Sequence, residues 1–177
     1  MNFHIKTYKP IAPVLVLIIP VFIISCGYRF SGKGQHLPGN IKRLCIATLD
    51  NRTGISGLET IMTNDLIYEF TRSGTALITD RQNADAVLTG TIRSATSETI
   101  SHQSSYTILE RRIKVILDLK MIGKQGRIYW AENGMSDFEE YRADPDKEIY
   151  EKNKKSAVKT LCKRLAQRIY YQLTNDF

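Results

Sequence analysis

The sequence contains few of the side chains from which metal and catalytic sites are usually built. It has three cysteines among 177 residues, and neither a Cys-x-x-Cys pair nor a Cys/His cluster occurs. Its three histidines, His4, His36 and His102, stand far apart and have no patterned carboxylate, serine or cysteine nearby. Metal ligands and catalytic groups normally recur in recognisable arrangements. We therefore expect no metal site and no enzymatic activity.

The sequence also lacks the features of nucleotide and nucleic-acid binding. Gly32-Lys33-Gly34 is too short for a phosphate loop and lacks the Ser or Thr that such a loop requires. The net charge of +7 is a mild excess, and no exposed strand interleaves aromatic with basic residues. We therefore expect no nucleic-acid partner. The basic excess does suit an anionic partner such as a phosphorylated lipid or a membrane surface.

Only one long apolar run is present, and it lies at the start of the chain. Residues 1–9 carry two lysines and no acid, residues 11–24 are almost wholly apolar, and Cys26 follows Ser25. A basic segment, a short apolar segment and a small residue before the break are typical of a secretory signal. The cysteine at the break predicts a lipoprotein signal at residues 1–25, with acyl chains such as palmitate attached at Cys26. Several acyl chains hold a protein on a membrane.

The alternative interpretation of this run is a transmembrane anchor. The run is shorter than the roughly 20 residues of a spanning helix, and Pro13 and Pro20 interrupt it, so the lipoprotein signal is favoured. In lipoproteins an aspartate after the cysteine favours inner-membrane retention, and Gly27 leaves outer-membrane sorting open. Cleavage would leave 152 residues with a net charge of about +5, which suits one domain. We assign residues 26–40 to a lipidated lead-in and 41–177 to a single α/β domain.

The two other cysteines, Cys45 and Cys162, would share an oxidising compartment in which a disulfide can form. Both have apolar neighbours, as in Leu44-Cys45-Ile46. Two buried free thiols acting as small hydrophobic side chains are therefore favoured over a disulfide.

The first part of the domain predicts a strand, a helix and more extended chain. Residues 41–49 are rich in apolar side chains and predict a strand, followed by a loop at 50–54. Ser56 with Glu59 predicts a capping box at the start of a helix that ends at Ser73 before Gly74. Its apolar residues recur every four positions and predict a face in the core. Residues 77–79 and 84–99 are expected to be extended, with the first two strands parallel.

The second part predicts a hairpin and a long helix. Ile113, Val115, Leu117, Leu119 and Met121 alternate with mostly polar residues, which predicts a strand with one core face. A turn at 123–126 leads to an antiparallel strand at about 127–141. Asp144 and Pro145 are expected to open the last helix, which ends near Thr174 and is about 40 Å long.

These elements predict an α+β fold in the order β-α-β-β-β-α. We expect two helices packed on one face of a four-stranded mixed sheet, so that both apolar stripes enter one core. The other face of the sheet would carry Arg112, Lys114, Asp118 and Lys120 and would meet solvent or a partner. Arg111, Arg112 and Lys114 are the strongest candidates for binding phosphate or an acidic partner surface, because three of four neighbouring residues are basic. Basic residues also crowd the last helix.

An ordered set of short motifs resembles the LptE family of lipopolysaccharide-assembly lipoproteins. The motifs are Cys26-Gly27-Tyr28-Arg29-Phe30-Ser31-Gly32, Leu37-Pro38, Ile41-Lys42, Asn51-Arg52-Thr53, Leu58-Glu59, Thr63-Asn64, Ala84-Asp85-Ala86-Val87-Leu88-Thr89-Gly90-Thr91-Ile92 and Gly126-Arg127-Ile128-Tyr129-Trp130. The resemblance covers essentially the whole chain after the signal.

The resemblance implies a lipid-anchored protein on the periplasmic face of the outer membrane. Such proteins plug the barrel of a large partner, LptD, help it to fold, and bind lipopolysaccharide on its way to the cell surface. They are not enzymes and use no cofactor. Cys26 is the lipid attachment site on this interpretation. His102, the loop at 101–106 and the basic residues beside it are expected to contact lipopolysaccharide or the barrel.

Two other classes of protein remain open. One is a different periplasmic lipoprotein adaptor, such as a cell-wall synthase activator or a secretion-channel subunit, although the short segment 27–40 argues against a long reach across the envelope. The other is a free-standing lipid carrier, which would need an apolar cavity that the packed helix stripes do not suggest.

Overall fold

The computed structural model describes residues 36–100 and 109–175. The chain divides into two compact units, Met1–Gly34 and Gln35–Phe177, and the description that follows concerns the second unit. Its strands and helices follow in the order β1 (Arg43–Ile46), β2 (Asp50–Asn51), α2 (Leu58–Ser73), β3 (Leu77–Ile78), β4 (Ala86–Ile100), β5 (Leu109–Gly123), β6 (Ile128–Ala143) and α3 (Lys147–Asn175). Two short 3-10 turns, Pro38–Asn40 and Lys124–Gly126, lie before β1 and between β5 and β6.

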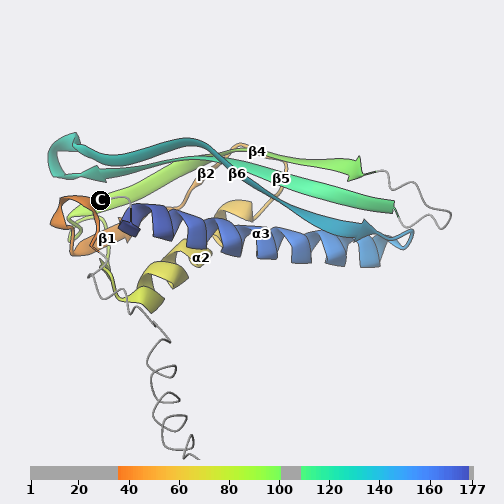
Figure 1. Cartoon of the computed structure of the whole chain (residues 1–177), viewed down its shortest axis with the longest axis horizontal. Helices are drawn as coiled ribbons and strands as arrows, with labels where there is room; N and C mark the ends of the chain where they lie inside the picture. The colour runs from red at the N-terminus through yellow and green to blue at the C-terminus, as the bar shows by residue number, and fades with distance from the viewer. Residues whose placement is uncertain (1–35, 101–108, 176–177) are drawn as a thin grey trace, which may run out of the picture. The chain divides into compact units, whose positions relative to one another are not determined.

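The strands form one mixed sheet in the order β3-β1-β4-β5-β6, and β2 pairs with β4 beside this path. β1 runs parallel to both β3 and β4, which confirms the predicted parallel start. β4, β5 and β6 form a long antiparallel meander. Both helices lie against the same face of the sheet, so the predicted arrangement of two layers is confirmed (Figure 1).

The predicted number of strands is wrong, because the sheet has six rather than four. The two extra strands, β2 and β3, contain two residues each. β3 lies in the segment 77–79 that was expected to be extended, but this segment was not counted as a separate strand. A period-two pattern cannot be recognised over the two residues of β2, which is extended because β4 supplies hydrogen-bond partners. In β2, Asp50 and Asn51 pair with Thr91 and Ile92, although their turn-forming side chains predicted a loop.

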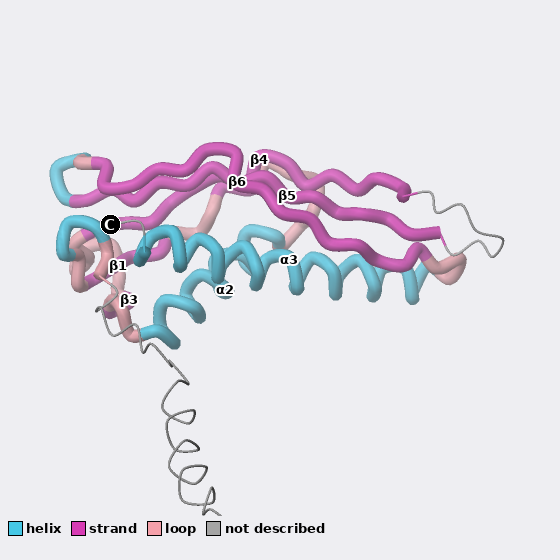
Figure 2. Tube along the Cα trace, in the orientation of Figure 1, coloured by secondary structure: helices cyan, strands magenta, loops and turns pink. Residues whose placement is uncertain are grey.

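The core lies between the meander and the helices (Figure 2). All five alternating apolar residues of β5 that were expected to face the core are at most 2 % exposed. Each such side chain stabilises the fold by about 1.5–3 kcal/mol relative to full exposure. The predicted apolar stripes of α2 and α3 meet them, and Phe70 packs edge-to-face on Tyr170 at 5.2 Å between ring centroids.

The helix starts differ from the predicted ones. α2 is preceded by Gly57 at φ +81° rather than by a Ser56 cap, and Glu59 accepts a 2.6 Å hydrogen bond from the side chain of Asn51. α3 starts two residues later than expected, because Asp146 rather than Asp144 accepts the backbone N–H groups of Glu148 and Ile149. The predicted stop of α2 is confirmed, since Gly74 adopts φ +66°.

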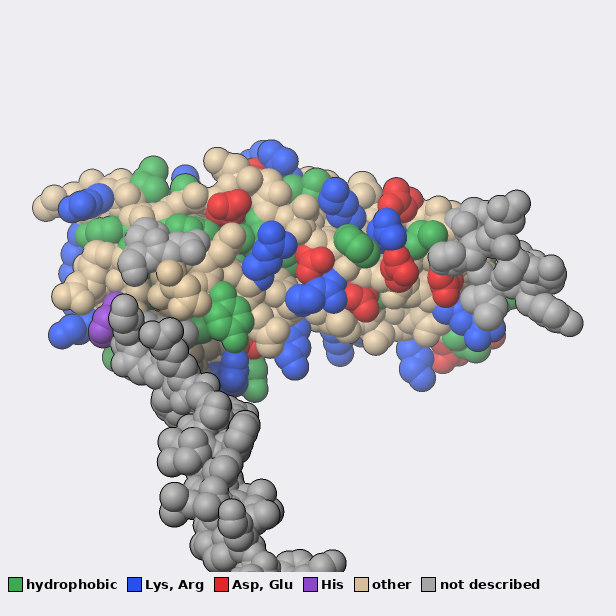
Figure 3. Space-filling view, viewed as in Figure 1, with side chains coloured by type: hydrophobic (Ala, Val, Ile, Leu, Met, Phe, Trp, Pro, Cys, Tyr) green, Lys and Arg blue, Asp and Glu red, His purple; other side chains and the backbone are tan. Residues whose placement is uncertain are grey.

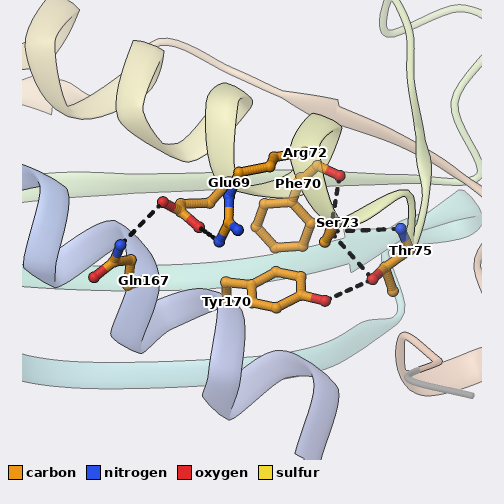
Figure 4. A network of polar contacts seen from close by, with 7 residues as sticks. All are labelled: Glu69, Phe70, Arg72, Ser73, Thr75, Gln167 and Tyr170. Carbon is orange, nitrogen blue, oxygen red and sulfur yellow. Dashed lines mark hydrogen bonds and ion pairs between the residues drawn. The ribbon is translucent and has the colours of Figure 1, made fainter. Parts of the chain in front are cut away.

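A buried carboxylate joins the two helices (Figure 4). Glu69 is 1 % exposed and accepts hydrogen bonds from Arg72 at 2.7 Å and from Gln167 of α3 at 3.3 Å. One turn after Gln167 on α3, the hydroxyl of Tyr170 lies 2.7 Å from the hydroxyl of Thr75, which follows α2. A buried charge is tolerated only when it is paired and hydrogen-bonded, which these partners provide. The network therefore fixes how α2 and α3 lie against each other.

An ion pair fastens the start of β1 to the segment before β4. The side chain of Arg43 donates a 2.8 Å hydrogen bond to Asp85, and the backbone N–H of Arg43 donates a second bond at 3.0 Å. The Arg43 hydrogen bond lowers the pKa of Asp85 from its ordinary value of 3.8 to about 2. Both residues lie in the part of the sheet that holds β1 in place.

Replacement of Asp85 by asparagine is expected to reduce the loss of folding stability that the wild-type protein shows as the pH falls below about 4. Because the pKa is lower in the folded protein, the native carboxylate stabilises the fold above about pH 4, and this contribution is lost as the pH falls toward 2. Urea midpoints at pH 7, 3.5 and 2.5 measure the effect, with Glu151→Gln as a control at an exposed carboxylate. Equal acid sensitivity of D85N and the wild type would contradict the assignment.

Within residues 36–100 and 109–175, no helix combines the length and the apolar character needed to cross a membrane.

Candidate functional site

The candidate site lies at the end of the sheet where β4 finishes at Ile100 and β5 begins at Leu109. There the three meander strands continue past the start of α2 and are accompanied by the N-terminal half of α3 (Figure 1). We call this region the tip. His102 and the loop at 101–106 connect the two strands and lie outside the described residues, as does Cys26.

The three basic residues expected to act together lie on opposite faces of the sheet. Arg111 faces α3, since its guanidinium donates a 3.0 Å hydrogen bond to the hydroxyl of Tyr150. Arg112 points to the other face, where it contacts Glu140 and Phe138. Adjacent side chains of a strand point in opposite directions, so Arg111 cannot share a charged patch with Arg112 and Lys114. Arg111 therefore does not form one surface with Arg112 and Lys114, while the contacts predicted for the three residues stay predictions.

Arg111 belongs to a small network of hydroxyl groups beneath the sheet. Besides Tyr150, its guanidinium donates to the carbonyl of Ser97 at 3.3 Å. The hydroxyl of Tyr141 lies 2.7 Å from the Ser97 hydroxyl and 3.2 Å from that of Tyr150. Burial raises the pKa of Tyr141, and the hydrogen bond with Tyr150 adds to this effect, so the phenol stays protonated. The network therefore surrounds the arginine with neutral groups.

The positive charge of Arg111 is not neutralised by any carboxylate among the described residues. Its Nε atom is buried and has no hydrogen-bond partner there. Arg111 lines a cavity of about 410 Å³ together with Arg142, Asp144 and Tyr150. Arg142 and Asp144 lie 4.0 Å apart and offset each other, which leaves one net positive charge. A guanidinium with free donors suits a phosphate or carboxylate, which it can bind in a fork.

The outer face of the sheet carries charges of both signs. Arg112 binds Glu140 at 2.6 Å, lies 4.0 Å from Glu98 and covers the ring of Phe138 at 4.3 Å. Lys114 is exposed and forms no ion pair with the described residues. On the side of the molecule drawn in Figure 3, basic and acidic side chains likewise alternate instead of gathering into one patch. This surface suits a polar, mixed-charge partner better than a uniformly acidic one.

Side chains of α3 cover the free edge of the sheet along β6. Arg164 donates to the carbonyl of Phe138, Arg168 to that of Ser136 at 3.2 Å, and Asn153 to that of Arg142 at 3.1 Å. These carbonyls belong to alternate residues and therefore point to the same side of the strand. Unpaired strand edges are sites of unwanted strand pairing, so this cover protects β6.

Arg164 is held in place by two carboxylates of the same strand. It binds Asp137 at 2.5 Å and Glu139 at 2.7 Å. These bonds raise the pKa of Arg164. Burial alone would raise the pKa of Asp137. The hydrogen bonds from Arg164 and from the Phe138 backbone N–H, together with the positive charges of Arg164 and Arg168, outweigh burial, and the pKa is lowered.

Replacement of Arg164 by alanine is expected to promote self-association through β6, because the change removes the cover from Phe138 and leaves two carboxylates unpaired. Sedimentation velocity across a concentration series measures the effect. Lys163→Ala is the matched control, because Lys163 is a neighbouring exposed residue of α3 that forms no hydrogen bond or ion pair with the described residues of β6. A monomeric R164A protein at every concentration would contradict the proposed role of the cover.

The two cysteines in the described part of the chain, Cys45 and Cys162, are free thiols. Cys45 is half-buried and Cys162 is buried, which confirms the preference for free thiols over a disulfide. Burial, with a smaller contribution from Asp65, raises the pKa of Cys162 to about 12, so it is not a reactive thiolate. The described residues contain no group of three or more His, Cys, Asp or Glu side chains that could hold a metal ion.

The fold is shared with bacterial lipoproteins of known structure. Rare lipoprotein B from Shewanella oneidensis is 14 % identical to this chain, with a TM-score of 0.53. The matched region covers 76 % of this chain and 96 % of the Shewanella chain. Lipoprotein B from Nitrosomonas europaea is also 14 % identical, with a TM-score of 0.52. The matched region covers 84 % of this chain and 90 % of the Nitrosomonas chain. At such identities the likeness concerns the fold alone.

The family follows from the sequence itself. The model of the LptE family, described as lipopolysaccharide-assembly, matches residues 41–173. The chain belongs to this family, and the resemblance noted from its motifs is confirmed. A comparison with curated proteins gave no match.

Proposed function

We propose that this chain is a non-enzymatic outer-membrane lipoprotein that takes part in lipopolysaccharide transport to the cell surface. A lipid anchor at Cys26 holds it at the periplasmic face of the membrane, where it fills an LptD-like barrel and helps it to assemble. The family match over residues 41–173 and the lipoprotein signal at 1–25 support this proposal. It needs no cofactor.

The observation that carries the lipopolysaccharide part of the proposal is the unneutralised guanidinium of Arg111 at the tip. Its free donors and the adjoining cavity of about 410 Å³ offer a place for one phosphate of lipid A. The outer sheet face, with Arg112 and Lys114, is assigned to the barrel, because a plug in a polar lumen needs a polar surface of mixed charge. The two halves of the basic run thus serve different partners.

Arg111→Gln is expected to weaken binding of lipopolysaccharide by roughly tenfold, since a hydrogen bond to a charged group contributes about 1.5–3 kcal/mol. The double variant R112Q/K114Q is the matched comparison on the opposite face. It is expected to leave lipopolysaccharide binding unchanged and to reduce recovery of the barrel. Binding is measured on the purified protein, and barrel recovery by affinity purification from detergent-solubilised outer membrane.

Recovery of the wild-type protein with a large barrel protein in near-equal amounts would support the plug function. Recovery with a cell-wall synthase or a secretion channel would instead support the adaptor alternative. Unchanged lipopolysaccharide binding by R111Q would remove Arg111 from the site.

A further inference from the structure

A second cavity lies between the start of α2 and the N-terminal half of α3. Its volume is about 880 Å³, and it shares no lining residue with the Arg111 cavity. The space exists because α3 continues past the start of α2 (Figure 2), and the buried residues of α3 begin only at Ala157. We call this cavity the α2–α3 groove. Its size is within the roughly 300–1,000 Å³ that is usual for small-molecule sites.

The floor of the groove is apolar. It is formed by Ile55 from the loop before α2, Ile61 from the first turns of α2, and Val158 from α3. Ile55 and Ile61 are only partly buried although both pack against the core, and Val158 is 4 % exposed. Apolar surface that stays in contact with water at the bottom of a cavity gains free energy when an apolar group covers it.

The rim of the groove is basic. Four lysines of α3 line it: Lys152, Lys154, Lys155 and Lys159. None of them forms an ion pair with the described residues, even though Glu148 and Glu151 lie on the same helix and also line the groove. The arginines differ, because Arg43, Arg112 and Arg164 each bind a carboxylate directly. The lysine rim therefore keeps a net positive charge.

The charge is spread along the helix rather than concentrated at one point. Lys152 and Lys159 are seven residues apart, which corresponds to about 10 Å along the axis of α3. A single phosphate cannot contact both ends of such a row, whereas two phosphates on one headgroup can. The apolar floor beside the row adds a place for part of an acyl chain.

We infer that the α2–α3 groove binds an acylated sugar phosphate that carries two phosphate groups, of the lipid A type. The lysine row binds the phosphates, and Ile55, Ile61 and Val158 contact an acyl chain. The inference rests on the proposed function for the class of lipid, and it adds a binding site separate from Arg111. The protein then contacts its lipid at two places, at Arg111 of β5 and in the α2–α3 groove, rather than at the tip alone.

The test is a binding titration of full-length protein in an uncharged detergent with purified lipid A. The groove variant K155Q/K159Q is expected to bind lipid A roughly tenfold more weakly than the wild type. The control variant K42Q/R81Q removes the same amount of charge outside both cavities and is expected to bind as the wild type does. Equal losses in the two double variants would overturn the inference in favour of general electrostatic attraction.

Four further ligands test the chemistry of the groove. Monophosphorylated lipid A and deacylated lipid A headgroup are each expected to bind more weakly than lipid A, and less sensitively to K155Q/K159Q. Phosphatidylglycerol that binds as tightly as lipid A would overturn the two-phosphate assignment. A polyglutamate peptide is the last ligand. If it binds more tightly than lipid A, and displaces lipid A only from proteins with an intact lysine row, the groove binds an acidic protein segment and the inference is overturned.

The R111Q protein separates this inference from the proposed function. If R111Q loses lipid A binding while K155Q/K159Q binds normally, the groove inference is wrong and the proposed function stands. If the wild type does not bind lipid A at all, both are wrong. If both variants lose affinity independently, two sites are present.

Discussion

Replacement of Phe70 by alanine is expected to lower the free energy of unfolding by about 3–5 kcal/mol, the range for removing a large buried aromatic side chain. Phe70 is 0 % exposed and lies where α2, α3 and the sheet meet. Its edge contact with Tyr170 would also be lost, leaving that ring beside a cavity. The surrounding elements are held by the Glu69 network and cannot close easily around the gap (Figure 4).

Urea unfolding of the purified protein measures the change in free energy. Tyr68→Ala is the matched control, because Tyr68 is an aromatic residue of the same helix but is 57 % exposed. Surface substitutions of this kind usually change stability by no more than about 0.5 kcal/mol. Similar losses in F70A and Y68A would mean that the two helices are not packed as described.

Gly90→Ala is expected to lower the free energy of unfolding by about 2–3 kcal/mol, at the upper part of the range for overpacking. A Cβ atom at Gly90 would lie 2.3 Å from the backbone carbonyl oxygen of Asp118 and 2.7 Å from the side chain of Leu119. The carbonyl belongs to β5, the central strand of the meander, so it cannot move without disturbing the pairing on both sides. The methyl group would therefore separate β4 from β5.

Gly54→Ala is the matched control for this change. A Cβ atom at Gly54 would have no heavy atom within 4 Å, so the substitution adds a methyl group to open space. It is expected to be neutral or slightly stabilising, because alanine restricts the unfolded chain more than glycine does. Thermal and urea unfolding compare the two variants, and a G90A protein as stable as G54A would contradict the described strand contact.

The candidate site shows how a strand limits what can be predicted from a run of like charges. Arg111, Arg112 and Lys114 are close in sequence, and their clustering suggested one anion-binding surface. The alternation that correctly placed Ile113 and Val115 in the core also places Arg111 on the helix side and Arg112 on the other. The period-two pattern of the strand was therefore sufficient by itself to separate the two arginines.

The α2–α3 groove had no comparable signal in the sequence. The lysines of α3 were evident, but a row of lysines on a helix is usually a solvated face. Only the position at which α2 begins relative to α3 leaves Ile55 and Ile61 partly accessible beside that row. Likewise, the unpaired Nε of Arg111 depends on which groups the fold places around it.

Local and periodic features were determined by the sequence alone, because they depend on residues close together in the chain. These features include the core faces of β5, α2 and α3, the end of α2 at Gly74, and the motifs of the LptE family. Tertiary structure decided what depends on distant partners. The strand β2 exists only through its pairing with β4, and the edge of β6 is covered only because α3 returns beside it. Such contacts join residues far apart in the chain, and no local pattern encodes them.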